Sequence, residues 1–354
     1  MPIITDPDRT RAMLEELRGR QVALPCFCTE NAWTTEAVLE ATVAAGERYG
    51  LPRPPVSISF CSCYPARQHL KNYRVCGRHE LGLESLLADL RTLTDTGGPY
   101  ANCRVFPMLD HGQPEADRWL LEDRLDVFAM VMYDASHQPF EENLRSTADY
   151  VQRFGDRVVV EGAVAELKEA AAAGEAFQMT GPERAARFLS ETGCDLIVPN
   201  VGTEHRAAEA GKARYHPEVA RELREAVGHR MVLHGTSCMG EAGLGGVPFD
   251  GFVKVNVWTI IETTGARAVV DWVMQNLGNL LPRERLEELV EDGLCGPRVL
   301  SPEHVEEWFG GEVGPKLDYF PLSNLQRRWV GEVSEQLERY FEMFGYERLA
   351  EGGD

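Results

Sequence analysis

Acidic and imidazole side chains follow short apolar runs along the middle of this chain. In the clearest case the run 105–109 ends in Asp110, His111 and Gly112. Neutral imidazoles are common zinc ligands, and a carboxylate beside a substrate can carry a proton in general acid–base catalysis. These residue types at adjacent positions indicate metal-assisted chemistry, provided that the fold brings partners to them.

Five later apolar runs end in or carry further candidates for such chemistry. In chain order these are Asp134 to His137, Glu161, Gly202 to His205, His234 to Ser237, and Lys254, Asn256 and Thr259. Three of the histidines, His111, His205 and His234, suffice for a catalytic zinc site, in which three imidazoles leave the fourth position open. The pattern therefore favours a metal site over three unrelated histidines.

Eight strand-like apolar runs would position these groups. They lie near 22–27, 55–61, 103–109, 127–133, 157–160, 194–198, 230–233 and 252–257. Most are apolar on both faces, as parallel strands buried between two layers are. Helical patterns separate most of the runs, at 33–49, 84–94, 140–154, 182–192, 217–227 and 260–281.

This alternation predicts an α/β fold, a (β/α)8 TIM barrel with a C-terminal helical extension. The carboxyl ends of all barrel strands share one rim, so the candidate side chains would meet there. A doubly wound open sheet is the alternative, but no glycine-rich dinucleotide fingerprint follows the first strand. We expect a catalytic barrel over residues 1–282 and a helical appendage over 283–354, which packs on the barrel or on a neighbouring subunit.

The composition excludes several classes of partner. The 354 residues carry a formal net charge of −20, which repels nucleic acid and anionic lipid surfaces. No apolar run approaches the roughly 18 residues of a membrane span, and the first residues lack a basic, apolar signal sequence. The cysteines number nine, which is odd. Together these features predict reduced thiols and a cytoplasmic protein.

Six stretches, taken in this order and spacing, resemble the class II (zinc-dependent) fructose-bisphosphate and tagatose-bisphosphate aldolases. They are Leu-Asp-His-Gly at 109–112, Val-Met-Tyr-Asp-Ala-Ser-His-Gln-Pro-Phe-Glu-Glu-Asn at 131–143, Val-Glu at 160–161, Gly-Thr-Glu-His at 202–205, Val-Leu-His-Gly-Thr-Ser at 232–237 and Lys-Val-Asn-Val at 254–257. The stretches that contain Asp134 and His234 are specific together. The resemblance implies the TIM barrel fold and aldolase activity.

The resemblance implies one catalytic Zn2+ held by His111, His205 and His234, with Asp134 and Glu161 near the metal as supporting or alternative ligands. The zinc would bind the oxygens of a ketose phosphate or of dihydroxyacetone phosphate and act as a Lewis acid on the carbonyl. The resemblance leaves open whether a monovalent cation also binds.

In the same resemblance, Asp110 would be the general acid and base on the acceptor aldehyde oxygen. Family members move the donor proton with a loop glutamate, and of three glutamates in the corresponding loop we choose Glu175. The expected partners are a phosphorylated sugar or triose and further copies of the chain, in a homodimer or homotetramer. The residues that match donor and phosphate contacts are Gly235, Ser237, Asn256 and Thr259.

Several positions expected around the substrate depart from the family pattern. Cys28 and Cys61 stand where an asparagine and a serine are usual, and Trp258 stands where Asn, Asp or Ala is usual. Arg206 replaces a glycine and would supply a forked donor for phosphate. Because the histidines and Asp110 are kept, these differences predict a divergent member with a specialised acceptor aldehyde and the same reaction type.

Two other interpretations remain at this point. One is a metal-dependent hydrolase or sugar isomerase on the same barrel. Hydrolase barrels of the amidohydrolase type usually place His-x-His after the first strand, where this chain has Cys26, Phe27 and Cys28. The other is a non-catalytic relative. The loss of the family's second acid after Glu161 fits that interpretation, and the intact Asp110 argues against it.

Overall fold

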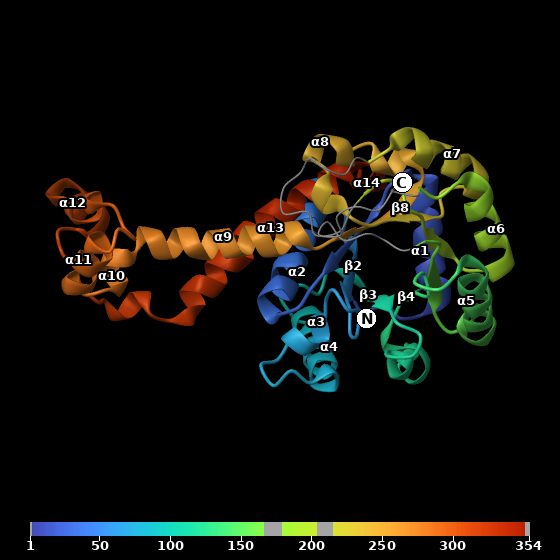
Figure 1. Cartoon of the computed structure of the whole chain (residues 1–354), viewed down its shortest axis with the longest axis horizontal. Helices are drawn as coiled ribbons and strands as arrows, with labels where there is room; N and C mark the ends of the chain where they lie inside the picture. Colours follow the sequence, from blue (N-terminus) through green and yellow to red (C-terminus); the bar gives the residue numbers. More distant parts are fainter. Residues whose placement is uncertain (1, 166–178, 204–214, 351–354) are drawn as a thin grey trace.

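The chain folds around a closed barrel of eight parallel strands (Figure 1). The computed structural model describes residues 2–165, 179–203 and 215–350. The strands are β1 (Leu24–Cys28), β2 (Pro55–Phe60), β3 (Arg104–Gly112), β4 (Met130–Tyr133), β5 (Val159–Ala163), β6 (Leu196–Val198), β7 (Met231–Leu233) and β8 (Phe252–Val257). Strand β1 pairs with both β2 and β8, which closes the sheet. The predicted TIM barrel is therefore confirmed, and the open sheet is wrong.

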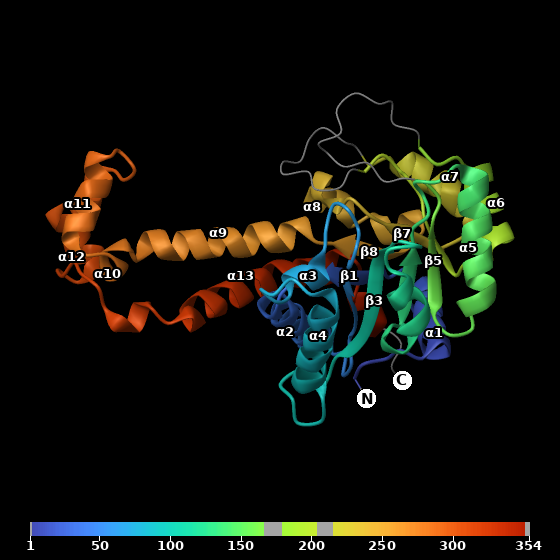
Figure 2. The same ribbon diagram turned by 60° about the horizontal axis from the view of Figure 1, so that its bottom comes forward.

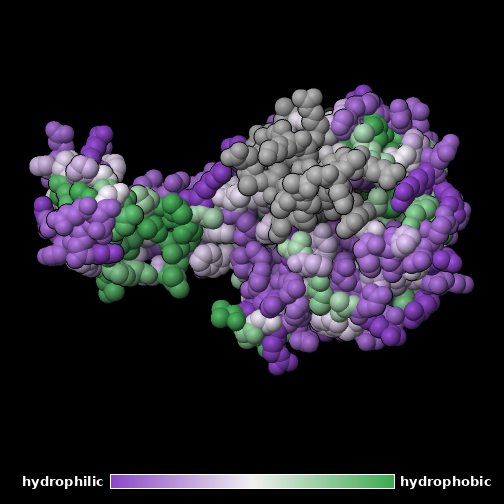
Figure 3. Space-filling model, viewed as in Figure 1, coloured by the Kyte–Doolittle hydropathy of each residue, from purple (hydrophilic) through white to green (hydrophobic). Residues whose placement is uncertain are grey.

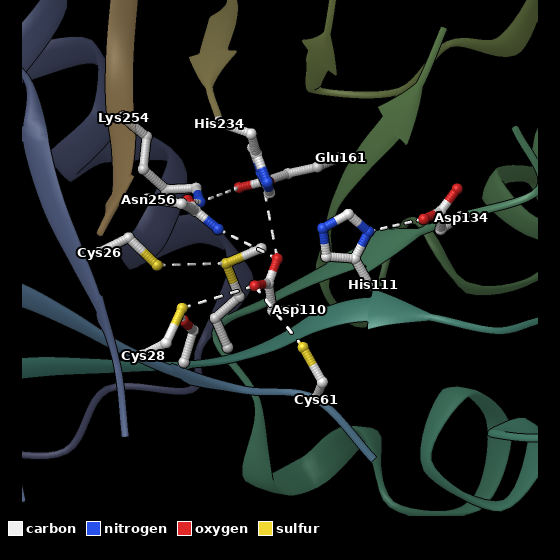
Figure 4. Close-up of polar contacts among 12 residues, drawn as sticks. Cys26, Cys28, Cys61, Asp110, His111, Asp134, Glu161, His234, Lys254 and Asn256 are labelled. Atoms are coloured by element: carbon white, nitrogen blue, oxygen red, sulfur yellow. Dashed lines mark hydrogen bonds and ion pairs between the residues drawn. The ribbon is translucent and has the colours of Figure 1, made fainter. Parts of the chain in front are cut away.

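Burial of both faces explains why the strands read as continuous apolar runs. Every strand residue except Arg104 is buried, because side chains alternate between the barrel interior and the surrounding helices. Several polar residues of the strands point into the barrel (Figure 4). Lys254 and Asn256, two residues apart on β8, share the inward face, as do Cys26 and Cys28 on β1.

Helices alternate with the strands and surround the barrel. The outer helices are α2 (Ala32–Tyr49), α4 (His79–Thr94), α5 (Phe140–Phe154), α6 (Pro182–Thr192), α7 (Pro217–Val227) and α9 (Thr259–Gln275). Short turns complete the connections: α3 (His69–Asn72), α8 (Glu241–Leu244), the π-helical η1 (Trp119–Asp123), and the 3-10 helices η2 (Leu125–Val127), η3 (Thr236–Cys238) and η4 (Val247–Asp250). Proline in the first turn of α6 and α7 starts both helices where the sequence predicts them.

One helical prediction differs from the structure. The pattern at 260–281 is expected as one helix, but α9 ends at Gln275 and the short α10 (Leu277–Leu280) follows. Asn276 lies between the two helices with φ −116° and ψ 14°, outside helical geometry, and its side-chain amide donates to the carbonyl of Trp272. This local hydrogen bond competes with the helix, as asparagine commonly does.

The C-terminal helices form an arm that projects from the barrel (Figures 1 and 2). Its elements are the outer part of α9, then α10, α11 (Arg283–Glu291), η5 (Pro297–Leu300), α12 (Pro302–Phe309), η6 (Leu317–Tyr319) and the start of α13 (Leu322–Met343). Helix α13 returns along α9 to the barrel and packs on α2. The residues beyond position 282 therefore include both a projecting part and a part that lies on the barrel.

The end of the chain packs on β1 and on the amino end of β2. Tyr340 and Phe341 of α13 pack edge-on against Phe27 of β1. The hydroxyl of Tyr346, before α14 (Glu347–Ala350), donates to the carbonyl of Pro55 at the start of β2. Because Tyr346 is fully buried, these contacts join the C-terminal segment to the barrel core.

The N-terminal helix α1 (Pro7–Gly19) lies at the same end of the barrel. Its apolar face is buried, and Arg11 forms an ion pair with Asp195, just before β6, at 2.7 Å. Asp6 caps the helix by accepting the backbone N–H of Arg9 at 2.8 Å. Across the described part of the chain, no helix is long and apolar enough to pass through a membrane.

Close packing of α9 on α13 depends on a glycine. A Cβ atom added at Gly265 would lie 2.4 Å from the indole ring of Trp329, whereas one added at Gly331 of α13 meets nothing within 4 Å. Gly265→Ala should therefore destabilise the protein by about 1–3 kcal/mol, because the helices must move apart. Gly331→Ala should stabilise it by up to about 1 kcal/mol, since alanine favours helix. Urea unfolding of both variants measures the difference, and equal effects would contradict this packing.

Candidate functional site

The site begins at an irregularity in β3. Pairing between β3 and β4 shifts register between Leu109 and Gly112, and His111 adopts a positive φ of 49°. In a regular strand Asp110 and His111 would face opposite sides of the sheet. The bulge instead turns both side chains toward the mouth of the barrel, as bulges beside active sites do. Strand β3 extends past the apolar run expected near 103–109 and continues through both residues.

Asp110, His111 and His234 form a group that fits a metal ion. One ligand atom from each lies within 4.8 Å of the others, and all three side chains are buried. The rings of His111 and His234 meet edge to face, with centroids 5.1 Å apart. His234 follows β7, and its carbonyl accepts the hydroxyl of Thr203 after β6 at 2.7 Å. Figure 4 shows the three side chains converging from their strands.

Asp134 orients His111. Its Oδ2 lies 2.6 Å from Nδ1 of His111, and its Oδ1 accepts the hydroxyl of Ser136 at 2.6 Å. Burial raises the pKa of Asp134, but hydrogen bonds from His111 and Ser136 outweigh it, so its pKa is lowered overall. An ionised carboxylate only accepts, so Nδ1 carries the proton and Nε2 is the nitrogen for a metal. Metal-binding histidines usually have such a carboxylate behind them.

Aromatic packing holds His111 from another side. The ring of Tyr64, in the loop after β2, stacks on the His111 ring with centroids 4.1 Å apart and an interplanar angle of 11°. Burial lowers the pKa of His111, but Asp110 and Asp134 raise it overall, whereas burial lowers the pKa of His234 well below its usual value. The two carboxylates thus favour a cation at this point, and the neutral His234 is suited to bind one.

Asp110 sits at the centre of the barrel mouth. Its Oδ1 accepts the amide of Asn256 at 3.0 Å, and its Oδ2 lies 3.5 Å from the sulfur of Cys28 and 3.8 Å from that of Cys61. Burial raises the pKa of both thiols well above the usual value, so they stay protonated and can donate. Burial also raises the pKa of Asp110, but His111 and other nearby cations lower it overall. Asp110 is therefore ionised at neutral pH.

Glu161 and Lys254 form a fully buried ion pair inside the barrel. Oε1 of Glu161 lies 3.3 Å from Nζ of Lys254, and Lys254 also donates to the amide oxygen of Asn256 (Figure 4). Burial raises the pKa of Glu161 to about 7, although Lys254 acts in the opposite direction. The candidate metal group found among the described residues consists of Asp110, His111 and His234. Glu161 is not in this group and pairs with Lys254 instead. A role for Glu161 as a ligand stays a prediction.

A cleft opens from Asp110 and His234 toward the ends of β7 and β8. Four residues expected to contact substrate, Gly235, Ser237, Asn256 and Thr259, line it together. Cys28 and Trp258, two of the departures from the family pattern expected around the substrate, also line the cleft, as does Arg67, for which the sequence predicted no role. His205, Arg206 and Glu175 lie outside the described residues, so their expected roles stay predictions.

Tyr64 and Arg67 are site residues that sequence reasoning missed. Both lie in the connection that follows β2, for which the sequence indicates only the helical pattern at 84–94. The rule that polar side chains after barrel strands meet at one rim applies to this connection as well. Applied there, it would have pointed to Arg67, whose guanidinium lies over the indole of Trp258 at 4.3 Å.

Comparisons with known proteins identify the family. The family model Fructose-bisphosphate aldolase class-II matches residues 8–293 of this chain. The match covers most of the sequence and all eight strands. The chain therefore belongs to the class II fructose-bisphosphate aldolase family, and the resemblance noted in the sequence is confirmed. Aldolases are lyases.

Individual relatives agree with this assignment. A fructose-bisphosphate aldolase of Thermus caldophilus is 36% identical over 235 residues, 64% of this chain and 68% of that protein. The YdjI protein of Escherichia coli K12 is 32% identical over 133 residues, 36% of this chain and only 48% of the relative's length.

Solved structures show the same fold. A fructose-bisphosphate aldolase from Campylobacter jejuni aligns with a TM-score of 0.72 at 19% identity, covering 97% of this chain and 95% of that chain. The YdjI aldolase of E. coli K12 aligns with a TM-score of 0.63 at 20% identity, covering 95% of this chain and 96% of that chain.

The Glu161–Lys254 pair yields a test of the buried site. Lys254→Met leaves Glu161 buried without its cation and should cost about 3–5 kcal/mol. The double variant Glu161→Gln, Lys254→Met removes both charges and should recover much of that loss. Arg283→Gln, which breaks an exposed pair with Glu287, is the control and should change stability by less than about 0.5 kcal/mol. Urea unfolding measures all variants; equal losses in the single and double variants would mean that the pair is not coupled.

Proposed function

We propose that this protein is a zinc-dependent aldolase that reversibly cleaves a ketose phosphate at a carbon–carbon bond. The observation that carries the proposal is the convergence of Asp110, His111 and His234 at the carboxyl ends of barrel strands, in a chain of this family. The site fits zinc, because the imidazoles of His111 and His234 lie within reach of one point and Asp134 stands behind His111. His111, His234 and, by the family pattern, His205 would hold the ion.

Zinc, when bound, supplies a Lewis acid for the substrate carbonyl. Asp110 handles the proton on the other side of the breaking bond. In cleavage its ionised carboxylate takes the proton of the substrate hydroxyl, and in condensation it returns that proton to the aldehyde oxygen. Asn256, Cys28 and Cys61 hold this carboxylate in one orientation. Proton transfer at the donor carbon is assigned to Glu175.

The substrate is proposed to carry a phosphate, as a dihydroxyacetone-phosphate-like donor does. Gly235, Ser237 and Thr259 line the cleft beside Asp110, and helix α9 begins at Thr259. Backbone N–H groups at such a helix start can bind a phosphate even in an acidic protein. Arg206 is proposed as a further phosphate contact. Because the polar groups around the cleft differ from the family pattern, a specialised acceptor aldehyde is proposed.

Retro-aldol and condensation assays test the reaction. The zinc-loaded protein should cleave at least one member of a ketose-phosphate panel, and a chelator should abolish the activity. Asp110→Asn removes the base but keeps the shape of the side chain, so turnover should fall at least about 100-fold while the zinc content is unchanged.

Three results would count against this assignment. Loss of zinc from Asp110→Asn would make Asp110 a ligand rather than a proton carrier. Conversion of ketose to aldose without fragments would favour an isomerase. A protein with no measurable zinc affinity would favour a non-catalytic relative.

We also propose that the appendage 283–354 has two roles, with α13 lying on the barrel and the arm contacting another copy in a homodimer or homotetramer. Apolar surface gathers on the arm in Figure 3. The exposed side chains there include Val270, Met274, Leu317, Phe320 and Leu322, which are 50–82% exposed. Contiguous exposed apolar surface of this kind commonly marks a protein interface.

Two leucines of the arm test the assembly. Leu317→Glu combined with Leu322→Glu should shift the protein from an oligomer toward a monomer, because it places charges in the apolar contact. Leu81→Glu, on the barrel helix α4 and 44% exposed, is the matched control and should leave the assembly unchanged. Size-exclusion chromatography with light scattering measures the mass. A monomeric parent protein, or an arm variant that assembles normally, would reject the proposed contact.

A cytoplasmic location is proposed as well. Among the cysteines whose side chains the structure describes, eight have free thiols, as expected in a reducing compartment, and three of these lie around Asp110 and Met108.

A further inference from the structure

Three buried N–H groups gather at one corner of the barrel mouth. They are Nε of Arg67, Nε2 of His69 and Nε1 of Trp258, and none has a hydrogen-bond acceptor among the described residues. The three side chains contact one another through Trp258: the guanidinium of Arg67 lies 4.3 Å from the indole, and the ring of His69 lies 5.8 Å from it. Buried donors without acceptors are rare, because each costs free energy. Three in one place indicate a ligand that accepts hydrogen bonds.

The tautomer of His69 is fixed by the backbone. The N–H of Cys61, at the end of β2, donates to Nδ1 of His69 at 3.1 Å. Since Nδ1 accepts this bond, the ring proton is on Nε2, which is the atom without an acceptor. Burial and the charge of Arg67 lower the pKa of His69 to about 3, so the ring stays neutral. His69 is therefore a neutral donor that is built into the loop and not a proton carrier.

Arg67 brings a positive charge to the same corner. Its stacking on Trp258 holds the planar guanidinium in place, and both residues line the cleft with Asp110, Gly235 and Ser237. Across the described residues, Arg67 has no ion pair, although the chain carries a net charge of −20. A guanidinium with its fork available is suited to a carboxylate or a phosphate.

We propose that Arg67, His69 and Trp258 form an oxyanion-binding corner that recognises a phosphate or carboxylate group of the substrate. The corner makes the loop after β2 a specificity-determining element, together with Trp258 at the start of α9. Its assignment to the substrate of an aldol reaction rests on the proposed function, whereas anion binding by the three donors does not.

Direct binding of inorganic phosphate tests the corner without reference to catalysis. Calorimetric titration is carried out on the zinc-loaded protein and again after chelation, so that binding to the metal is separated from binding to the corner. Arg67→Gln should weaken phosphate binding roughly 10- to 100-fold in both forms, because it removes a charge-assisted donor. Trp258→Phe keeps an aromatic ring for Arg67 to stack on but removes the indole N–H, and should weaken phosphate binding by a smaller factor.

Arg74→Gln is the matched control. Arg74 lies on the same connection, is exposed and donates to Ser85 at 2.7 Å, so the variant should bind phosphate as the parent does. Thermal unfolding of each variant checks that the loop is still folded. Phosphate affinity that is equal in Arg67→Gln and the parent would overturn the proposal.

Kinetics distinguish the two sources of the anion. If the corner binds the donor phosphate, Arg67→Gln should raise the donor KM at least about tenfold and leave the aldehyde KM unchanged. If it binds an acidic group of the acceptor, the variant should lose its preference for glyceraldehyde 3-phosphate over glyceraldehyde. In either case kcat should change much less than KM. If no KM changes, the corner does not serve this substrate and the proposal fails.

Failure of the proposed function gives a different result. A protein without aldol activity that loses phosphate binding in Arg67→Gln would reject the aldolase assignment and retain the anion site. An active aldolase in which Arg67→Gln changes neither phosphate affinity nor any KM would retain the aldolase assignment and reject the anion site.

Discussion

Charged groups enclosed by a closed sheet must each find a partner, and the arrangement of the barrel mouth follows from that constraint. Asp110 has His234, Asn256 and two thiols around it, and Glu161 has Lys254. Each contact also fixes a direction. A carboxylate held from several sides keeps one orientation, which is what proton transfer to a particular oxygen requires.

The bulge in β3 is the backbone feature that lets Asp110 and His111 both face the site. A barrel strand offers only alternate residues to the interior, so two adjacent residues cannot both face the site without an irregularity. The positive φ of His111 costs free energy, and the hydrogen bond to Asp134 together with stacking on Tyr64 offsets it. Backbone strain, the histidine proposed to bind the metal and its carboxylate partner Asp134 thus coincide at a single turn of the chain, beside the residue proposed to move the proton.

Residue types and their spacing were enough to predict the barrel and the grouping of three candidate site residues at its rim. Strands buried on both faces read as apolar runs, and the rim rule then placed Asp110, His111 and His234 together. The oxyanion corner was not predictable in this way. Arg67 lies in an irregular loop and His69 begins the one-turn helix α3, so neither belongs to a long periodic pattern. Their position against Trp258 depends on how the connection after β2 packs against the start of α9.

The sequence by itself determined the order of strands and helices, the family and the identity of the chemical groups, because these depend on local pattern and composition. Only the tertiary structure decided which groups touch. Cys28 and Cys61 are departures from the family pattern in the sequence, and in the fold they are neutral donors around Asp110. Trp258 is a large substitution in the sequence, and in the fold it is the surface on which Arg67 stacks. The physical reason is that hydrogen bonding and stacking act over a few ångströms between residues far apart in the chain, a distance that only the closed barrel sets.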